Sequence, residues 1–337
     1  MDRIAIIGTG LIGTSLGLAL RRAKVRNVEI LGHDREPTNA SKARKLGAID
    51  RMAWSIPDAV EGANLVIIAV PVQSVREVLA VAGPLVNEGT IITDTASTKS
   101  DVVRWAEEIL PSNVHFVGGH PMAGKETPGP DGAEADLFEG AYYCIVPGRR
   151  TPRESVRVVA DLAQSVGAVP YFLDPQEHDG LVAAVSHLPL VVSAALVNIV
   201  SDTPSWREMG KLASSGFRDV SRLASGDPEM ARDICLTNQE AIVYWLDEMI
   251  GSLTRYKEMI REGGEALDTA FTQAKVTRDK WLRGEFEPGA ENQQLPTLND
   301  VVGDFFLGSV GRRLLGQTDE VAKRIEEQQR RRREEKS

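Results

Sequence analysis

The sequence predicts an α/β protein whose first half forms a parallel sheet covered by helices and whose second half is all helical. Short, nearly continuous apolar segments alternate with amphipathic segments from residue 3 to about residue 173. Such strands are typical of a parallel sheet that is buried on both faces. Beyond Asp174 the apolar residues recur mostly at helical spacing. With 337 residues, the chain is long enough for two domains.

The strand-like segments follow one another in the order that a doubly wound domain requires. They are 3–7, 28–31, 65–70, 90–93, 114–117 and 142–146, and the pattern ends near 169–173. A helix is expected over 11–24, and helical patterns separate most of the other strands. Because right-handed crossovers place helices on both sides of a parallel sheet, the expected topology is doubly wound.

Three regions are expected along the chain. Residues 1–173 form the sheet domain, residues 174–285 a helical domain, and residues 286–337 a linker followed by a charged helical tail. The linker is rich in Pro, Gly, Gln and Asn, and the tail contains four consecutive arginines shortly after Glu326 and Glu327. Acid and arginine four residues apart stabilise a solvated helix. A role of the arginines in binding nucleic acid or a membrane is the alternative.

Charge and cysteine content exclude several classes of protein. The chain has 39 Lys and Arg against 48 Asp and Glu, a net charge of -9, which argues against a general nucleic-acid surface. Two cysteines cannot form a disulfide framework, and no Cys/His cluster has the spacing of a metal site. The N-terminal residues lack the pattern of a cleavable secretory signal. A soluble, cytoplasmic protein without a bound metal is expected.

One segment, 181–200, is apolar over nearly the length of a membrane-spanning helix. Polar residues or proline interrupt it, and acids flank it: Ser186, His187, Pro189, Ser193 and Asn198 within it, Asp179 and Asp202 beside it. Polar groups are costly in the bilayer core. We therefore expect a buried helix or a helix at a subunit interface rather than a transmembrane span.

A glycine-rich fingerprint directly follows the first expected strand and opens the first expected helix. It consists of Gly8, Thr9, Gly10, Leu11, Ile12 and Gly13, which fit G-x-G-x-x-G. The first glycine permits a tight turn, the second lets the backbone approach a pyrophosphate, and the third allows close packing of helix on strand. The free N–H groups of the helix then bind the phosphates. The first domain is therefore expected to be of the Rossmann type and to bind a dinucleotide.

An acid at the end of the second strand indicates which dinucleotide is bound. Asp34 lies about 20 residues after Gly13, where a carboxylate binds the ribose 2′-hydroxyl of NAD. A carboxylate at this place repels the 2′-phosphate of NADP, so NAD is the expected cofactor. Arg35 keeps NADP as the alternative, because its guanidinium can bind that phosphate.

His120 is the main candidate for acid–base chemistry among the five histidines. It follows a strand, within His-Pro-Met-Ala-Gly-Lys-Glu, and so lies at the carboxyl edge of the sheet, where open α/β folds bind ligands. An imidazole titrates near neutrality and suits proton abstraction from a hydroxyl. The alternative is a loop histidine with a purely structural hydrogen bond.

Four other residues have both a functional and a structural interpretation. Ser97 follows another strand and can bond either a substrate hydroxyl or His120, or it can cap a helix that starts near Lys99. His187 is a polar residue in the apolar helix, and such a histidine usually makes a hydrogen bond in the core. Arg218 and Arg222 can each bind a carboxylate through a bidentate fork, or they can form surface ion pairs.

Four stretches together resemble the prephenate dehydrogenase family, which includes the closely related arogenate dehydrogenases. They are residues 8–13, 94–99, 120–126 (HPMAGKE) and 186–189 (SHLP), and a fifth, 216–228, resembles the substrate-arginine segment of the family. They occur in the order of the family, over roughly residues 3–260. The pair HPMAGKE and SHLP is far more specific than the glycine fingerprint.

The resemblance implies an oxidative decarboxylation. Prephenate transfers a hydride from ring C4 to NAD and loses its ring carboxylate as CO2, which yields 4-hydroxyphenylpyruvate for tyrosine biosynthesis. By resemblance, His120 accepts the proton of the 4-hydroxyl, and Ser97 bonds that hydroxyl and orients the histidine. Arg222 matches the arginine that binds a substrate carboxylate. His187 lines the pocket, and Glu126 closes it and influences ligand preference.

The resemblance also implies a homodimer formed through the helical domain. The nearest alternative is arogenate dehydrogenase, or an enzyme with dual cyclohexadienyl specificity, since Glu126 can pair with an ammonium group. Two further alternatives are a β-hydroxyacid dehydrogenase, for which Lys211 would be the acid/base, and an inactive NAD-binding sensor. The combination of His120, Ser97 and Arg222 favours the enzyme.

Overall fold

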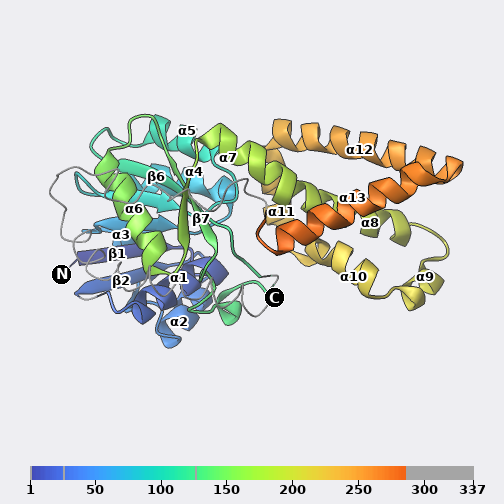
Figure 1. The fold of residues 1–337 in the computed structure, drawn as a ribbon. Coiled ribbons are helices and arrows are strands. Elements are labelled where there is room, and N and C mark those ends of the chain that lie inside the picture. The colour runs from blue at the N-terminus through green and yellow to red at the C-terminus, as the bar shows by residue number, and fades with distance from the viewer. Residues whose placement is uncertain (1, 26, 126, 286–337) are drawn as a thin grey trace.

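The computed structural model describes residues 2–25, 27–125 and 127–285. Figure 1 shows a sheet domain with helices on both sides, and beside it a helical domain that begins with α7 (Pro175–Val182). The expected linker and charged tail, 286–337, lie outside the described residues, as does Glu126. The three expected regions therefore stay a prediction.

The sheet has the expected doubly wound order. Its strands are β1 (Asp2–Ile7), β2 (Val28–His33), β3 (Arg51–Met52), β4 (Leu65–Ile68), β5 (Ile91–Asp94), β6 (His115–Pro121), β7 (Tyr142–Pro147) and β8 (Val169–Phe172). They lie in the order β3-β2-β1-β4-β5-β6-β7-β8, and all neighbours from β3 to β6 are parallel. The order reverses between β1 and β4, which creates a crevice at the carboxyl ends of these strands.

The sheet differs from the sequence-based expectation at its far edge. β7 is antiparallel to β6, with His120 opposite Cys144, and β8 is parallel to β7. The described residues of the connection from β6 to β7 contain a 3-10 turn (Pro130–Gly132) and no crossover helix, so the chain returns in the opposite direction. β6 also runs to Pro121, so His120 lies inside this strand and not after it. The two-residue β3 was too short to be expected.

Apolar side chains cover both faces of the sheet. The helices are α1 (Leu11–Arg22), α2 (Pro37–Lys45), α3 (Ile56–Val60), α4 (Val72–Ala82), α5 (Ser100–Ile109) and α6 (Arg153–Ser165). One core cluster contains residues of α3, α4 and α5, and a second cluster on the other face contains residues of α1, α2 and α6. All four residues of β4 are buried, which explains its continuous apolar sequence.

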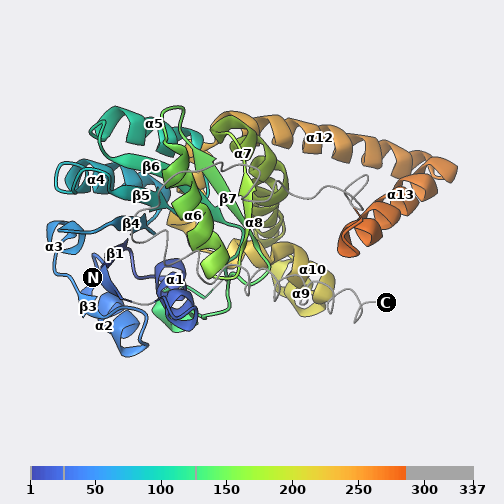
Figure 2. The same ribbon diagram turned by 60° about the vertical axis from the view of Figure 1, so that its left-hand side comes forward.

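The second domain is built from helices of very different length. After α7 come a π-helical turn (Ala183–His187), α8 (Leu188–Ser201), α9 (Trp206–Leu212), α10 (Ser215–Ser221), a 3-10 turn (Arg222–Ser225), α11 (Pro228–Thr237), α12 (Gln239–Glu262) and α13 (Glu265–Leu282). Figure 2 shows α12 and α13 extending away from the rest of the chain. Asp174 and Asp227 cap α7 and α11, because each side chain accepts bonds from two backbone N–H groups.

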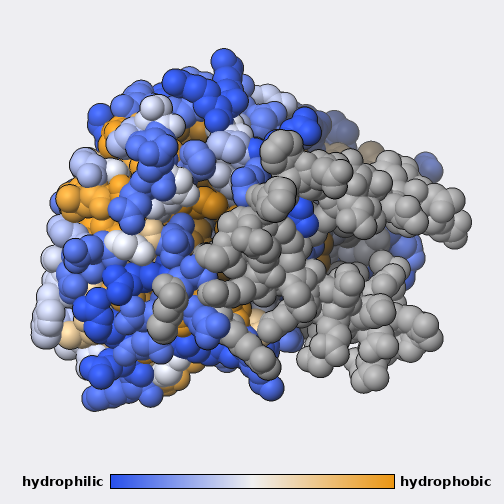
Figure 3. All heavy atoms as spheres, turned by 90° about the vertical axis from the view of Figure 1, so that its left-hand side faces the viewer, coloured by the Kyte–Doolittle hydropathy of each residue, from blue (hydrophilic) through white to orange (hydrophobic). Residues whose placement is uncertain are grey.

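The apolar helix 175–201 is largely exposed in a single chain. It has the length and hydropathy of a membrane span, and only 28% of its most apolar window is buried. Length and composition alone are weak grounds for a span, and the described chain continues on both sides as a globular fold. α12 and α13 also expose large apolar side chains, including Leu253 and Phe271. By contrast, the end of the sheet domain in Figure 3 is mostly hydrophilic. The interior-helix expectation is wrong for the single chain, and the subunit-interface alternative fits.

Candidate active site

The glycine-rich turn has the shape of a phosphate cradle. A Cβ on Gly13 would lie 1.9 Å from the carbonyl oxygen of Gly8, and one on Gly8 would lie 2.3 Å from that of Ala69. Gly8 also has a φ of +95°, in the region that favours glycine. A Cβ on Gly10 would meet no other described residue within 4 Å, so the described part of the chain leaves open space in front of α1. Because no side chain caps α1, its first N–H groups can bind a pyrophosphate there.

Replacing Gly13 with alanine is expected to displace this turn. The new methyl group overlaps the backbone of Gly8, which has to shift to make room for it. Overpacking of this kind lowers the free energy of unfolding by about 1–3 kcal/mol. We expect a lower melting temperature and a Kd for NAD raised about tenfold or more. Gly10→Ala is the matched control, because its methyl enters only the open space: it should weaken NAD binding and leave the melting temperature unchanged. Unchanged NAD affinity in both variants would contradict the cradle.

Asp34 lies beside the glycine-rich turn, as the fingerprint requires. Its carboxylate accepts hydrogen bonds from the backbone N–H of Thr9 at 2.7 Å and of Glu36 at 2.9 Å. These bonds fix the carboxylate at the end of β2, next to the start of α1. The adjacent Arg35 is exposed, and a guanidinium nitrogen of its side chain lies 4.0 Å from a carboxylate oxygen of Glu229 in the helical domain. The structure thus brings the expected cofactor residues together.

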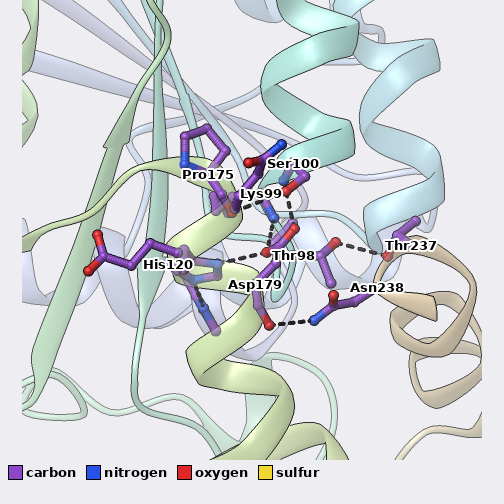
Figure 4. A network of polar contacts seen from close by, with 12 residues as sticks. Thr98, Lys99, Ser100, His120, Pro175, Asp179, Thr237 and Asn238 are labelled. Carbon is purple, nitrogen blue, oxygen red and sulfur yellow. Dashed lines mark hydrogen bonds and ion pairs between the residues drawn. The ribbon is translucent and has the colours of Figure 1, made fainter. Parts of the chain in front are cut away.

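His120 lies at the junction of the two domains in a chain of polar contacts. Its Nδ1 atom is 2.9 Å from Nε2 of His178 on α7. The Nδ1 atom of His178 is in turn 2.8 Å from a carboxylate oxygen of Asp179. His120 and His178 are both buried. Figure 4 shows this network, with α5 on one side and α7 crossing it.

Asp179 caps a helix of the other domain. Its two carboxylate oxygens accept bonds from the backbone N–H groups of Lys99 at 2.7 Å and Ser100 at 2.8 Å, at the start of α5. The alternative in which Ser97 caps this helix is therefore wrong, because α5 starts later and the capping carboxylate comes from α7. Burial favours the neutral acid, but hydrogen bonds from His178 and Ser100 outweigh it and lower the pKa of Asp179.

His187 ends the π-helical turn and joins the same cluster. Asn238 donates from Nδ2 to Nδ1 of His187 at 3.1 Å and to the carbonyl oxygen of Asp179 at 2.8 Å. The proton of the neutral ring therefore lies on Nε2, which is buried near the Ser97 backbone and makes no well-formed hydrogen bond to any described residue. Burial lowers the pKa of His187 to about 4. Pro189 has no backbone N–H to donate, and the π-helical turn (Ala183–His187) just before it accommodates the missing helical hydrogen bond.

A buried ion pair lies close to His120 and His178. Nζ of Lys99 bonds a carboxylate oxygen of Asp94, and both side chains are fully buried. The Asp94 carboxylate also accepts bonds from the backbone N–H groups of Ala96 and Gly119. This pair therefore ties the end of β5 to the strand that contains His120.

The surroundings of His120 keep its imidazole neutral. Burial is the largest cause that holds the pKa of His120 well below its usual value, followed by the nearby His178, Lys99 and His187. Burial likewise lowers the pKa of His178. A neutral imidazole with a free lone pair is the form that accepts a proton. The arrangement therefore suits a general base that is active at neutral pH.

The other candidate residues are less tightly placed. Ser97 lies on the turn between β5 and α5, half-buried, close to the histidine cluster. Arg222 is exposed and begins the 3-10 turn after α10, outside the buried cluster. This turn is anchored on α8, because Ser193 Oγ accepts a bond from the Ala224 N–H at 3.1 Å. Arg218 is exposed on α10.

The sequence-based reasoning missed several residues of the site. It assigned no role in the site to His178, Asp179 or Asn238, nor to a pair of Lys99 with Asp94, and it used Asp179 only as an acid beside the apolar segment. One signal was available: His178 and Asp179 are adjacent polar residues on the first turns of α7, just after its Asp174 cap. The partners of the other residues are distant in sequence, so no local pattern marks them.

Comparison with known families gives matches over both domains. The model of the prephenate dehydrogenase nucleotide-binding domain matches residues 16–172, and that of the prephenate dehydrogenase dimerization domain matches residues 174–273. Prephenate dehydrogenase of Bacillus subtilis is 38% identical over 283 residues, covering 82% of this chain and 76% of that protein. Cyclohexadienyl dehydrogenase of Zymomonas mobilis is 32% identical, covering 82% and 94%.

Solved structures give the same result. Prephenate dehydrogenase of Aquifex aeolicus, in complex with hydroxyphenyl propionate and NAD+, matches with a TM-score of 0.77 and 34% identity, covering 83% of this chain and 98% of that one. Arogenate dehydrogenase of Synechocystis matches with a TM-score of 0.70 and 31% identity, covering 83% and 99%. The fold, the two domain matches and these relatives agree with the four sequence stretches, and the chain belongs to the prephenate dehydrogenase family.

Proposed function

We propose that this protein is an NAD-dependent prephenate dehydrogenase that converts prephenate to 4-hydroxyphenylpyruvate and CO2 in tyrosine biosynthesis. The observation that carries the proposal is a buried, neutral imidazole, His120, at the domain junction next to the nucleotide-binding sheet. The B. subtilis relative named prephenate dehydrogenase supports the choice of substrate. The Synechocystis arogenate dehydrogenase keeps arogenate as the alternative substrate, and the Z. mobilis cyclohexadienyl dehydrogenase keeps dual specificity as an alternative.

The residues of the first domain fit NAD. The glycine-rich turn, with Gly8, Gly10, Leu11, Ile12 and Gly13, offers open space and free N–H groups to the pyrophosphate. The fixed carboxylate of Asp34 suits a ribose 2′-hydroxyl and repels a 2′-phosphate. When bound, NAD supplies the hydride acceptor.

His120 is proposed to accept the proton of the ring 4-hydroxyl. As the negative charge grows on that oxygen, the hydride leaves C4, the bond to the ring carboxylate breaks, and its electron pair completes the aromatic ring. CO2 is released. Ser97 is proposed to bond the same hydroxyl, so that the reacting oxygen is held between a hydroxyl group and an imidazole. The protein thus mainly orients the ring and stabilises charge that develops in the transition state.

Three residues are proposed to recognise the rest of the substrate. Arg222 binds a carboxylate, His187 lines the pocket, and Glu126 closes it and influences ligand preference. Prephenate is a dianion, and the net charge of the chain is -9, so local positive charge has to overcome overall repulsion. Lys125 is already paired with Glu134. Arg222 is the proposed main anchor, because it matches the carboxylate-binding arginine of the family segment 216–228.

Arg222→Ala is expected to weaken substrate binding and to leave the chemical step largely intact. A charged hydrogen bond contributes about 1.5–3 kcal/mol, so we expect KM for prephenate to rise about 10- to 100-fold. The neighbouring Arg218→Ala is the matched control and should change KM less than about threefold. The measurement is steady-state kinetics at fixed, saturating NAD. An unchanged KM in Arg222→Ala would remove this residue from the proposed site.

The protein is proposed to act as a cytoplasmic homodimer with the three regions 1–173, 174–285 and 286–337. Exposed apolar residues on α8, α12 and α13 support association through the helical domain, for example Ile199, Leu253 and Phe271. An open groove of about 930 Å³ lies between α12 and α13. Burial of these surfaces in a second copy also explains why a helix as apolar as 175–201 occurs in a globular fold.

The direct test is the appearance of NADH when the purified protein is incubated with NAD and either prephenate or arogenate. We expect NADH with prephenate and a much lower kcat/KM with arogenate. A preference for arogenate would assign the protein to the other branch of the family. No NADH with either substrate, in folded protein that binds NAD, would refute the proposed function.

A further inference from the structure

We propose that His178 and Asp179 are positioning residues that determine which ring nitrogen of His120 carries the proton. They act through His120 and do not touch the substrate. The inference rests on the function proposed above and adds to it a reason why the base has the correct tautomer. It depends on three consecutive contacts: the α5 start to Asp179, Asp179 to His178, and His178 to His120.

The direction of the hydrogen bonds, from donor to acceptor, is set at Asp179. This carboxylate accepts two backbone N–H groups at the start of α5, at 2.7 and 2.8 Å, and an ionised carboxylate only accepts. The Nδ1 atom of His178, 2.8 Å away, must therefore donate its proton to Asp179. The α5 start is a region of positive partial charge, which favours the ionised acid.

The contact between His178 and His120 then has a defined donor and a defined acceptor. A neutral His178 that carries its proton on Nδ1 has a lone pair on Nε2, which accepts a hydrogen bond 2.9 Å from Nδ1 of His120. His178 is 0% exposed, so bulk water does not compete for either nitrogen. His120 then has its proton on Nδ1 and its lone pair on Nε2. Only this tautomer presents a basic nitrogen on the side away from His178.

The same contacts stabilise the product of proton transfer. When His120 takes a proton on Nε2, the ring becomes positively charged and its Nδ1–H bond to His178 becomes stronger. The negative charge of Asp179 lies on the far side of His178, in the direction of that bond. Burial, His178, Lys99 and His187 disfavour this charge, and the chain of bonds through His178 to Asp179 is proposed to offset part of that cost. Because Asp179 bonds α5 of the other domain, docking of the two domains fixes the base.

Two substitutions of His178 separate its hydrogen bonds. The amide of asparagine occupies roughly the place of Nδ1, so His178→Asn keeps the bond to Asp179 and loses the one to His120. The longer His178→Gln places its amide near Nε2 and keeps an acceptor for His120. We expect kcat to fall about 100-fold or more in His178→Asn and less than about tenfold in His178→Gln. KM for prephenate and Kd for NAD should change less than about threefold in both.

The tautomer can also be observed without activity. The chain has five histidines, so ¹⁵N-labelled imidazoles can be assigned by NMR, with His120→Asn identifying the His120 signals. We expect the Nδ1–H form of His120 in the wild-type protein and in His178→Gln, and loss of this form in His178→Asn. A wild-type Nε2–H form, or equal kcat losses in the two variants, would overturn the inference. A wild-type protein with the expected tautomer but no activity on prephenate would instead refute the proposed function alone.

Discussion

His120→Asn is expected to lower kcat about 10²- to 10⁴-fold while NAD binds as in the wild-type protein. Asparagine keeps a polar group near the place of Nδ1, 2.9 Å from His178, so the packing of the buried site is largely preserved. It lacks a nitrogen of sufficient basicity at the place of Nε2. The 4-hydroxyl then has no base in the transition state, and the loss appears in kcat.

The pH dependence of the wild-type protein tests the same residue. Burial, followed by His178, Lys99 and His187, holds the pKa of His120 well below 6.5. A base with a lowered pKa stays neutral to lower pH, so activity should persist through mildly acidic pH and fall only as pH drops through that pKa. The measurement is the acidic limb of the pH profile of kcat/KM for the wild-type protein.

For His120→Asn, the measurements are kcat and the Kd for NAD, obtained by titration with NAD. A kcat of His120→Asn within about threefold of the wild-type value would refute the assignment of the base.

The sequence predicted the sheet domain well because its determinants are local. Nearly continuous apolar strands, a glycine-rich turn and an acid at the end of β2 each follow from residues that are neighbours in the chain. The antiparallel β7 was not predicted, since the direction of a strand depends on the connection before it. That connection has no helical pattern, and this feature was the available signal.

The active site could be predicted only in part, because its decisive contacts join distant residues. His120, Ser97 and His187 stand out through their motifs. The contacts of His120 with His178 and of Lys99 with Asp179 span 58 and 80 residues. They exist only because α7 packs across the start of α5. Ser97 was one candidate for the helix cap, because local rules look for the cap within the preceding residues, whereas here the capping carboxylate comes from another domain.

Asp161→Asn is expected to stabilise the protein at alkaline pH. Asp161 is a fully buried residue of α6, and neither carboxylate oxygen has a hydrogen-bond partner among the described residues. Burial raises its pKa to about 7, although Arg157, one turn earlier on α6, opposes the shift. An acid with a raised folded-state pKa binds more protons in the folded than in the unfolded protein. Its contribution to stability therefore falls as pH rises from about 4 to 7 and stays low above that range.

The size of the expected effect follows from the shift of the Asp161 pKa from 3.8 to about 7. At about 1.4 kcal/mol per pKa unit, the raised pKa of Asp161 lowers the free energy of unfolding by up to about 4 kcal/mol at pH 8 and by only about 0.5 kcal/mol at pH 4. Asparagine resembles the protonated acid in shape and polarity, so the two proteins should unfold alike near pH 4.

Urea unfolding at about pH 4, 6 and 8 measures this difference. The exposed Asp136→Asn controls for the loss of one negative charge from a chain of net charge -9. A gain for Asp161→Asn that grows with pH is the expected result. A pH-independent difference, or a loss at pH 8, would mean that Arg157 pairs with the carboxylate in solution. In that case the carboxylate would be a stabilising group, because removing one partner of a buried ion pair costs about 3–5 kcal/mol.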